Sequence, residues 1–586
     1  MTSHSSTSTV GTSEATETQD GSSSSDGSTD GSTETEGAAT TESGDDVIDL
    51  PELKTVDDGH FATSLVCVEC HANHPNAMAM RDDQSRPIAP DDLWQGSMMA
   101  NSARDPFWWA MVAAETATFP AKKAEIEAEC MPCHAPMAVV DGVFHDAGTP
   151  SLDWLRADDD RASFGLDGVA CAACHQIQPD KLGSEASFSG NYVIKPVAEI
   201  YGPHAEPYPN PMMMHTSFTP TQGQQLLDSA HCGSCHTLRT AALDPDGTPN
   251  GHSLVEQGPY LEWRLSDFTT EGQPGPDAAS CQDCHVPKES VDGVPLSAKI
   301  ARRPNGGDFE QISPRDPFGR HVMVGGNSII PLVIRDNAAE LGPRASATAL
   351  EATAAAAKAL LEHDTATLSA EASREGDALV VDVKVDNLAG HKLPSAFPSR
   401  RAWIALRVVD SDGVLVFRSG DSDEIGRLVD GSGQPLPSEA VGGPIQPHFT
   451  EISAQSQAQI YESVMATDDD VPAFRLLQGA RYLKDNRLLP KGWKSDAPEA
   501  EEIAAVGVEG DPNFTGGGDQ TRYTIAAPAA AGPYTITAEL CYQTLSARFA
   551  AELFAVDATE VRAFERMLKT ADRTPVIIGS ETLMTD

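Results

Sequence analysis

Five copies of one short pattern, Cys-x-x-Cys-His, carry the chemistry of this sequence. They use all but one of the 11 cysteines among 586 residues. The copies, numbered one to five in chain order, are Cys67-Cys70-His71, Cys130-Cys133-His134, Cys171-Cys174-His175, Cys232-Cys235-His236 and Cys281-Cys284-His285. Positions i, i+3 and i+4 share one face of a helical turn. Two thiols on that face can form thioethers to one haem while the imidazole takes the iron, which is the attachment pattern of c-type haem.

Other cysteine chemistry explains the five copies less well. Structural zinc needs four ligands, so zinc would pair the motifs and leave one over. A thioredoxin-like redox centre needs one motif, and iron–sulfur ligation gives no role to the histidine that follows each pair. We therefore expect five covalently attached haem c groups, with zinc or a disulfide framework as the alternatives. Cys541, outside the motifs, lies in a strand-like run and is expected to be buried.

The second axial position of each iron needs a ligand from outside the motifs. His321 in GRHVMVGGNS and His391 in NLAGHKLPSAFPSRRAW stand in loops rich in Gly and Pro, where they have no evident packing role. His215 in PMMMHTSFTP is another candidate, and further ones are His74, His145, His204, His231 and His252. Met98 or Met99 could supply a thioether that raises a haem potential, with Met99 favoured, although methionine in an amphipathic helix also serves as packing.

The elements that position the motifs are expected to be short helices and long loops. We predict helices over residues 93–119 and 121–134, the second carrying its motif at the C-terminal end, and an Ala-rich helix over 344–368. The hydrophobic pattern then changes to a period of two, which predicts strands at residues 377–389, 402–410, 413–419, 458–466, 521–527 and 533–545. Residues 547–571 again fit a helix. The predicted fold class is α+β and multidomain: a loop-rich helical multihaem c-type cytochrome region, an antiparallel β-sandwich and a C-terminal helix.

These patterns divide the chain into five segments. Residues 1–58 form an acidic Ser/Thr/Gly tether, predicted to be disordered because it has too few hydrophobic residues to offset the entropy of ordering. Residues 59–342 form a pentahaem domain and 343–368 a helical connector. Residues 369–545 form the β-sandwich domain, and 546–586 form the C-terminal helix and a tail.

The charge of the chain limits its partners. Lys and Arg number 41 against 87 Asp and Glu, which gives a formal net charge of −46. Such a surface repels nucleic acid and attracts basic proteins, so we expect redox partner proteins with basic surfaces and no nucleic acid. No run approaches the roughly 18 apolar residues of a transmembrane segment.

The location expected for the protein follows from haem attachment, which takes place outside the cytoplasmic membrane. We expect an exported protein, in the periplasm or at the outer membrane and cell surface. The sequence as given has no basic and apolar export signal, so we expect the true start upstream. The tether resembles the linker that follows the lipidated cysteine of bacterial surface lipoproteins, which predicts a lipid anchor.

Several longer stretches resemble a known family. They are WQGSMMANSARDP, DGVACAACHQI, EQGPYLEW, NLAGHKLPSAFPSRRAW, YLKDNRLLP and LCYQTLSARFAAELF. With the motifs, they resemble the bacterial multihaem cytochromes c with a C-terminal β domain, whose haem part is related to the tetrahaem cytochrome c of ammonia oxidisers. The resemblance implies that His391 and His321 are haem ligands. Met99 stands where related chains often have the histidine of a Trp-x-x-Ser-x-His pattern.

Three functions are compatible with these features. Closely packed haems with filled axial positions would carry electrons in a respiratory or extracellular pathway, and the resemblance supports this. The alternative is a multihaem oxidoreductase acting on a nitrogen or sulfur oxyanion or on hydroxylamine, which needs one haem with an open axial position. The nitrite-reducing type usually marks that haem with Lys, whereas every motif here ends in His. A third is a subunit of an extracellular cytochrome filament, in which a histidine of one subunit binds a haem of the next.

Overall fold

The computed structural model describes residues 46–526 and 532–585. The predicted tether therefore lies outside the described residues as far as position 45. For residues 46–58 the prediction of disorder is wrong, because Ile48, Leu50 and Val56 are buried. The backbone N–H groups of Ile48 and Leu50 both bind Glu340, one through its carboxylate and one through its backbone carbonyl. Three apolar side chains and these hydrogen bonds attach the segment to the folded protein.

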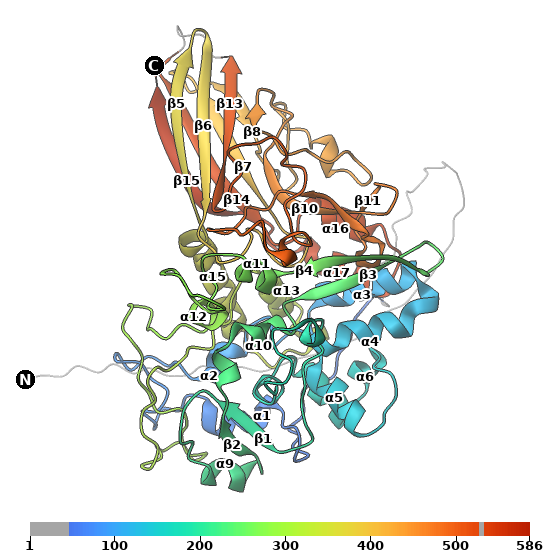
Figure 1. Ribbon diagram of the computed structural model, residues 1–586, viewed down its shortest axis with the longest axis vertical. Coiled ribbons are helices and arrows are strands. Elements are labelled where there is room, and N and C mark those ends of the chain that lie inside the picture. The colour runs from blue at the N-terminus through green and yellow to red at the C-terminus, as the bar shows by residue number, and fades with distance from the viewer. Residues whose placement is uncertain (1–45, 527–531, 586) are drawn as a thin grey trace, which may run out of the picture. The chain divides into compact units, whose positions relative to one another are not determined.

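The region that carries the motifs consists of short helices joined by long loops (Figure 1). The helices are α1 (Ser64–His71), α2 (Pro90–Trp94), α3 (Pro106–Thr118), α4 (Lys123–His134), α5 (Pro136–Phe144), α6 (Asp153–Arg156), α7 (Asp160–Leu166), α8 (Cys171–Cys174), α9 (Asn210–His215), α10 (Ser229–Gly233), α11 (Pro259–Arg264), α12 (Cys281–His285), α13 (Ile330–Asp336) and α14 (Ala338–Leu341). Two small sheets lie among them. One pairs β1 (Glu199–Gly202) with β2 (Thr219–Gln222), and the other pairs β3 (Leu238–Leu243) with β4 (Pro249–Gln257).

The prediction of one helix over residues 93–119 is wrong. Helix α2 ends at Trp94 and α3 begins at Pro106, with turns between them. Proline has no N–H and its ring clashes with a preceding helical turn, so it begins a helix rather than continuing one. The Asp105 carboxylate caps α3 by accepting the backbone N–H of Phe107 at 2.8 Å. The helix predicted over 121–134 is confirmed as α4, with its motif at the C-terminal end.

A long helix leads from this region into a β-sandwich. Helix α15 (Ala347–Asp364) confirms the Ala-rich prediction, but the chain enters β5 at Ala366, so the helix is shorter than predicted. The strands are β5 (Ala366–Glu375), β6 (Ala378–Asn387), β7 (Arg401–Val409), β8 (Leu415–Ser419), β9 (Glu451–Ile452), β10 (Ile460–Ala466), β11 (Pro472–Ala473), β12 (Arg481–Asp485), β13 (Gly518–Ala526), β14 (Tyr534–Gln543) and β15 (Val576–Thr585). One sheet has the order β5-β6-β13-β9. The other has the order β11-β10-β7-β14-β15, with β12 beside β10 and β8 beside β7.

The two sheets bury a shared apolar core, which confirms the predicted sandwich. Alternate residues of β6, such as Val381 and Val383, share one buried cluster with Leu406 of β7 and Ile536 of β14. Period-two alternation puts every second side chain of a strand on the core face. The pairing is antiparallel apart from the short parallel contact of β9 with β13.

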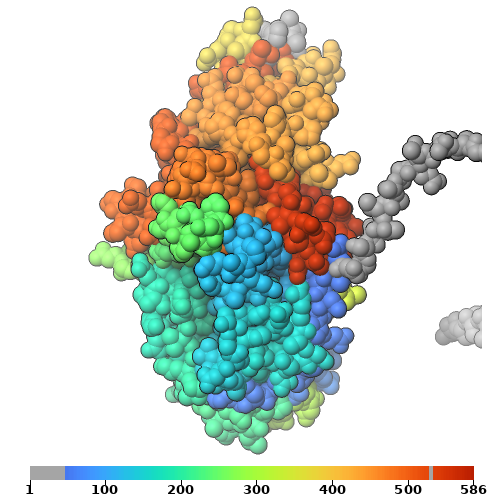
Figure 2. Space-filling model, turned by 90° about the vertical axis from the view of Figure 1, so that its right-hand side faces the viewer, coloured from blue at the N-terminus to red at the C-terminus, as the bar shows by residue number. Residues whose placement is uncertain are grey.

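The C-terminal region is two helices and a strand, not one helix and a tail. Helices α16 (Ala547–Phe554) and α17 (Thr559–Lys569) are followed by β15, which pairs with β14 from Val576 to Thr585. Phe564 and Met567 of α17 share a buried cluster with Trp109 of α3. In Figure 2 the C-terminal residues lie against those of α3.

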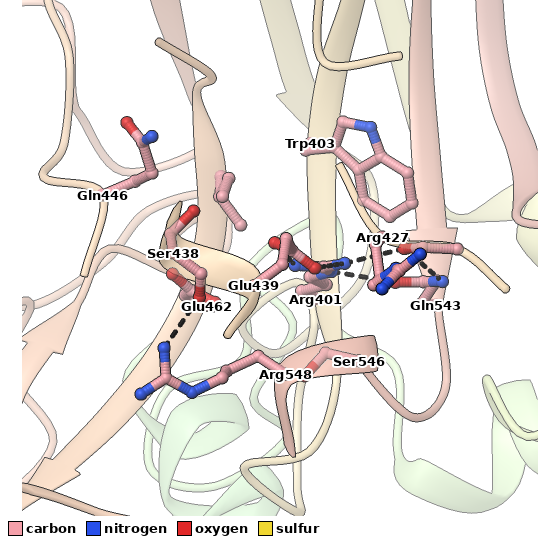
Figure 3. Close-up of polar contacts among 12 residues, drawn as sticks. Arg401, Trp403, Arg427, Ser438, Glu439, Gln446, Glu462, Gln543, Ser546 and Arg548 are labelled. Atoms are coloured by element: carbon pink, nitrogen blue, oxygen red, sulfur yellow. Dashed lines mark hydrogen bonds and ion pairs between the residues drawn. The ribbon is translucent and has the colours of Figure 1, made fainter. Parts of the chain in front are cut away.

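A buried ion pair fixes the irregular segment that follows β8. Arg401, at the start of β7, donates to both carboxylate oxygens of Glu439, at 2.8 and 3.0 Å (Figure 3). It also donates to the carbonyl of Gly426 and to the side chain of Gln543. These charge-assisted bonds satisfy the buried guanidinium and attach residues 426–439 to the sheet.

Membrane-crossing potential can be judged from helix length and hydropathy. Within residues 46–526 and 532–585, no helix combines the length and the apolarity that a membrane crossing requires.

Candidate haem-binding site

One large cavity is lined by both cysteines and the histidine of every motif. Its volume is ≈ 1500 Å³, which exceeds the roughly 300–1,000 Å³ of a pocket that holds a single small ligand. The motif residues fit covalently held haem, because thiols and imidazoles from all five copies reach the same space. These residues are Cys67, Cys70, Cys130, Cys133, Cys171, Cys174, Cys232, Cys235, Cys281 and Cys284, with His71, His134, His175, His236 and His285.

Local helices position most motifs as their spacing predicts. The first, second, third and fifth motifs lie on or end α1, α4, α8 and α12, whereas the fourth leaves α10 after Gly233. The fifth motif has a capping box in which Ser280 and Asp283 satisfy each other's backbone N–H. A single stable turn therefore holds the thiols and the imidazole of each of these motifs on one side.

Four of the five motif histidines leave one ring nitrogen for the cavity because the other is engaged. They place Nδ1 against a backbone carbonyl: His71 with Ile300 at 3.0 Å, His134 with Ser102 at 3.0 Å, His175 with Tyr201 at 2.6 Å and His285 with Val324 at 2.9 Å. This contact assigns the proton to Nδ1 and leaves the Nε2 lone pair for a metal. Burial lowers the pKa of all five, to about 4 for His134 and His236, which keeps the rings neutral as metal ligation requires.

His321 faces the third motif across the cavity. Its ring centre lies 6.3 Å from that of His175, and the two ring planes are 20° apart. Two metal–nitrogen bonds of about 2 Å on opposite sides of one ion place the ring centres about 6 Å apart. The His321 Nδ1 bonds the carbonyl of Gly319 at 3.1 Å, so its Nε2 is also left for a metal. The pair therefore fits the two axial ligands of one iron.

His391 lines the cavity near the fifth motif. Its Nδ1 contacts the carbonyl of Lys392 at 2.9 Å, as in the motif histidines. Burial, and then the charge of His391, lower the pKa of His285, so the two rings interact electrostatically. The loop that carries His391 reaches the haem region from the β domain.

A buried network of charges holds this loop in place. Lys392 Nζ lies 2.6 Å from Asp485, and Arg487 contacts both Asp485 and Glu262 of α11. Glu262 accepts the backbone N–H of Lys392 and the hydroxyl of Ser395. The two acids and two bases balance, so the network joins α11 of the haem region to the β domain without an unpaired buried charge.

Three other predicted ligands also line the cavity: His204, His215 and His231. His231 Nε2 lies 3.1 Å from the Cys174 sulfur, and its buried Nδ1 has no hydrogen-bond partner among the described residues. His215 is exposed and forms an ion pair with Glu69 of the first motif at 2.8 Å. Burial lowers the pKa of His204.

The remaining predicted histidine ligands lie elsewhere. The wall of the cavity does not include His74, His145 or His252. The His145 side chain is 54% exposed, and its Nδ1 binds Asp141. His252 lies in the exposed β3–β4 hairpin and pairs with Asp468, which lies between β10 and β11. His74 packs against Gly306.

Met98 and Met99 both line the cavity, in the turns between α2 and α3. The carbonyl of Met99 accepts the N–H of Val169, two residues before the third motif. The structure therefore brings Met99 close to the haem-binding motifs, although the amphipathic helix expected to carry it is absent.

The second motif has neighbours that the sequence analysis missed. Trp108 stacks on His134, with ring centres 4.6 Å apart and planes 7° from parallel. Burial raises the pKa of both Glu115 and Glu256 to about 7. Burial raises the pKa of the Cys130 thiol, and the negative charges of these two carboxylates raise it further. A glutamate inside the apolar run PFWWAMVAAETAT was a signal for Glu115, whereas the sequence gave no comparable sign of Glu256.

Comparisons with known proteins give limited similarity. No protein-family model matches the chain, and no curated protein matches it significantly. Among solved structures, the chain is similar to a penta-heme cytochrome c552 from Thermochromatium tepidum, with a TM-score of 0.47 and 16% sequence identity, covering 90% of this chain and 100% of that chain. At this level of similarity, the ligands of one chain do not determine those of the other.

Proposed function

We propose that the chain is an exported multihaem c-type cytochrome that carries electrons along five covalently bound haems. The observation that carries this proposal is the convergence of all five motifs on one cavity. The ten motif cysteines would hold the haems through thioethers, and the five motif histidines would bind the irons. Bound haem supplies one-electron redox chemistry, and the protein supplies its attachment, axial ligands and surroundings.

Contacts between motifs support an ordered relay. Hydrogen bonding to a cysteine of another motif is the largest influence on the pKa of five thiols. It raises the pKa of Cys171 through Cys67, of Cys133 through Cys235 and of Cys232 through Cys281, and it lowers the pKa of Cys235 through Cys133 and of Cys281 through Cys232. His231, next to the fourth motif, contacts Cys174 of the third. The first motif thus adjoins the third, and the third adjoins the fourth. The second and the fifth motifs also adjoin the fourth. Such a branched arrangement suits electron transfer between an entry site and more than one exit.

The distal ligands that we propose follow from placement. His321 is proposed for the haem of the third motif and His391 for that of the fifth. His215 is proposed for the first motif because it lines the cavity beside that motif, and ligation through Nε2 would require this atom to leave Glu69. Met99 remains a proposed ligand in the same cavity. If these four ligands bind, at most one haem is left to take a histidine from a neighbouring subunit, which favours a carrier over a filament subunit.

Partners and location complete the proposal. A net charge of −46 favours redox partners with basic surfaces. Haem attachment requires export, so we propose the periplasm or the cell surface, with a lipid anchor at the latter.

The first test is stoichiometry. The chain should be expressed with a haem-maturation system, and its intact mass measured under denaturing conditions that keep thioethers. A gain equal to five haems is expected. Four or fewer under complete maturation would contradict the proposal, and replacement of Cys281 and Cys284 by Ala should remove one haem without affecting the others.

An oxidoreductase is the second candidate, favoured by Glu115 and Glu256. Carboxyl groups with a pKa of about 7 can exchange protons at neutral pH, as chemistry on an oxyanion or on hydroxylamine requires. The reduced protein with added carbon monoxide distinguishes the two functions. A carrier with filled axial positions leaves the spectrum unchanged, whereas an enzyme with one open haem shows one carbonyl complex per chain.

A further inference from the structure

Three basic side chains line the cavity that the five motifs share: Lys288, Arg315 and Arg400. Lys288 forms an ion pair with Asp283, which lies within the fifth motif. Within the described part of the chain, the side chains of Arg315 and Arg400 bond only to backbone carbonyls and form no ion pair with Asp or Glu. Each of these two arginines therefore brings a positive charge to the cavity wall that no described carboxylate neutralises.

Backbone groups hold Arg315 in place. Its Nη1 and Nη2 donate to the carbonyls of Ala205 and Glu206, each at 2.9 Å. Its Nε is buried and has no hydrogen-bond partner among the described residues. A guanidinium has five N–H donors, so these two bonds fix its orientation and leave a buried donor unsatisfied. Such a donor is costly, which indicates that an acceptor belongs beside it.

The position of Arg315 is next to the first motif. Ala298 and Arg315 exchange two backbone hydrogen bonds, at 2.8 and 3.2 Å. The carbonyl of Ile300, two residues after Ala298, contacts Nδ1 of His71 at 3.0 Å. An acceptor bound by Arg315 would therefore lie close to the group that His71 binds.

Arg400 stands directly before β7, in the segment that also carries His391. Its Nη1 donates to the carbonyl of Ser395 at 2.9 Å, and its side chain forms no other hydrogen bond within the described residues. The next residue, Arg401, is by contrast satisfied by Glu439 and Gln543 inside the β domain (Figure 3). One arginine of this adjacent pair thus stabilises the β domain, and the other remains available to the cavity.

The charge of Arg400 acts on the fourth motif. Burial, the charge of His285 and then that of Arg400 lower the pKa of His236. Burial raises the pKa of Tyr542, which also lines the cavity, and the charge of Arg400 opposes this rise. Arg400 has no such effect on the other four motif histidines. An anion bound by Arg400 would therefore lie nearest to the fourth motif.

We propose that Arg315 and Arg400 bind the propionate carboxylates of the haems attached at the first and the fourth motif. The inference rests on the proposed multihaem function. Each haem carries propionate groups in addition to its iron, and a carboxylate taken out of water needs a charged partner that also donates hydrogen bonds. Arginine suits this task because its planar guanidinium can bind one carboxylate through two parallel hydrogen bonds.

The two arginines would raise the potentials of the haems that they contact. Reduction adds one electron, so a positive charge nearby favours the reduced state. At an effective dielectric constant of about 20, a unit charge about 10 Å from a redox centre changes its reduction equilibrium by about tenfold. The first motif is an end of the proposed relay and the fourth is its branch point. Electrons would therefore reside longer at these two positions.

The test uses the haem-loaded full chain, whose intact mass first establishes the number of haems. Arg400→Gln should lower one potential in a redox titration by about 59 mV, which corresponds to a tenfold change for one electron. Arg315→Gln should lower a different potential by a similar amount. Arg400→Lys keeps the charge and should restore most of the shift. Arg407→Gln is the matched control, since it removes the same charge from a surface pair with Asp421 outside the cavity and should leave every potential in place.

A second measurement covers the case in which a glutamine variant does not fold. Resonance Raman spectra of the lysine variants Arg315→Lys and Arg400→Lys should show shifted propionate bands, because an ammonium cannot reproduce the two-pronged contact of a guanidinium. The inference is overturned if the glutamine variants and Arg407→Gln have the same potentials in a haem-loaded chain, and equally if the propionate bands do not shift. The multihaem function survives both results. A mass without covalent haem would instead contradict that function, and the inference with it.

Discussion

The imidazole of His321 lies opposite that of His175, with ring centres 6.3 Å apart and planes 20° apart. Each ring bonds a backbone carbonyl through Nδ1, Gly319 for His321 and Tyr201 for His175. The backbone therefore orients both rings, and their ring-centre distance is close to that of two imidazoles bound to one metal ion.

In the proposed pentahaem carrier, replacement of His321 by Ala should convert one haem from low spin to high spin. The iron at the third motif would lose its distal imidazole, and the four other irons would keep theirs. Electron paramagnetic resonance of the oxidised protein measures the change. His145→Ala is the control, because that ring lies outside the cavity and binds Asp141. If every haem stays low spin in His321→Ala, His321 is not an axial ligand.

Replacement of Lys392 by Met should destabilise the protein and perturb the haem of the fifth motif. The change removes one partner of the buried Asp485 and frees the loop of His391, at a cost of about 3 kcal/mol in the free energy of unfolding. Guanidinium unfolding followed by fluorescence and by haem absorbance measures both effects. Lys384→Met breaks an exposed pair with Asp386 and should cost less than about 1 kcal/mol. Equal losses in the two variants would argue against a positioning role for the network.

Acid should weaken the same network. Burial raises the pKa of Asp485, but Arg487 and Lys392 outweigh it and hold the pKa at about 2. An unfolded Asp has a pKa of about 3.9, so the folded state favours the charged form. This contribution to stability is complete above about pH 4 and is lost as the pH falls towards 2. Asp485→Asn should remove that part of the acid dependence, and an unchanged slope between pH 4 and 2 would refute it.

The carboxyl groups beside the second motif should make a haem potential depend on pH. Burial raises the pKa of Glu115 and Glu256 to about 7, so the folded state binds their protons more tightly than the unfolded chain, where the pKa is about 4.3. Stability should therefore fall as the pH rises from about 4.3 to 7. A nearby haem that gains an electron raises these pKa values further. Its potential should fall with pH by at most about 59 mV per unit.

Glu256→Gln should reduce this slope in redox titrations between pH 5 and 8. Glu125→Gln, whose side chain is exposed beside Lys122, should leave it unchanged. Identical slopes in the two variants would place the proton-linked group elsewhere.

Replacement of Met99 by His tests the proposed thioether ligand. A thioether favours ferrous haem, so exchange for imidazole should lower one potential and leave four in place. Met98→Leu should change little, since it keeps apolar volume. A redox titration that shows no shift in Met99→His would make Met99 a packing residue.

Much of the fold was predictable because local patterns agree with tertiary structure. The alternating segments around Val383, Leu406 and Ile536 form strands of the sandwich, and the alanine-rich segment forms α15. The error over residues 93–119 has a local cause, since Pro106 starts a helix where hydrophobic periodicity alone suggested continuity. The strand β15 was missed because exposed polar residues dilute its pattern, and only its pairing with β14 determines its conformation.

The candidate site was predictable where the residues that carry the chemistry are close together in the sequence. Each of the five motifs places two cysteines and a histidine within five positions. Trp108 and Glu256 could not be assigned in this way, because only tertiary contacts bring them to the second motif. His145 was predicted as a ligand from its residue type, but it lies outside the cavity that the motifs line.

The order of segments along the chain has a consequence for biogenesis. Every motif precedes residue 286, whereas the loop of His391, helices α16 and α17 and strand β15 all come later. A chain that emerges from its N-terminal side exposes its motif cysteines before the later segments have emerged. Attachment of the proposed haems can therefore precede the pairing of β15 with β14, which completes the edge of that sheet.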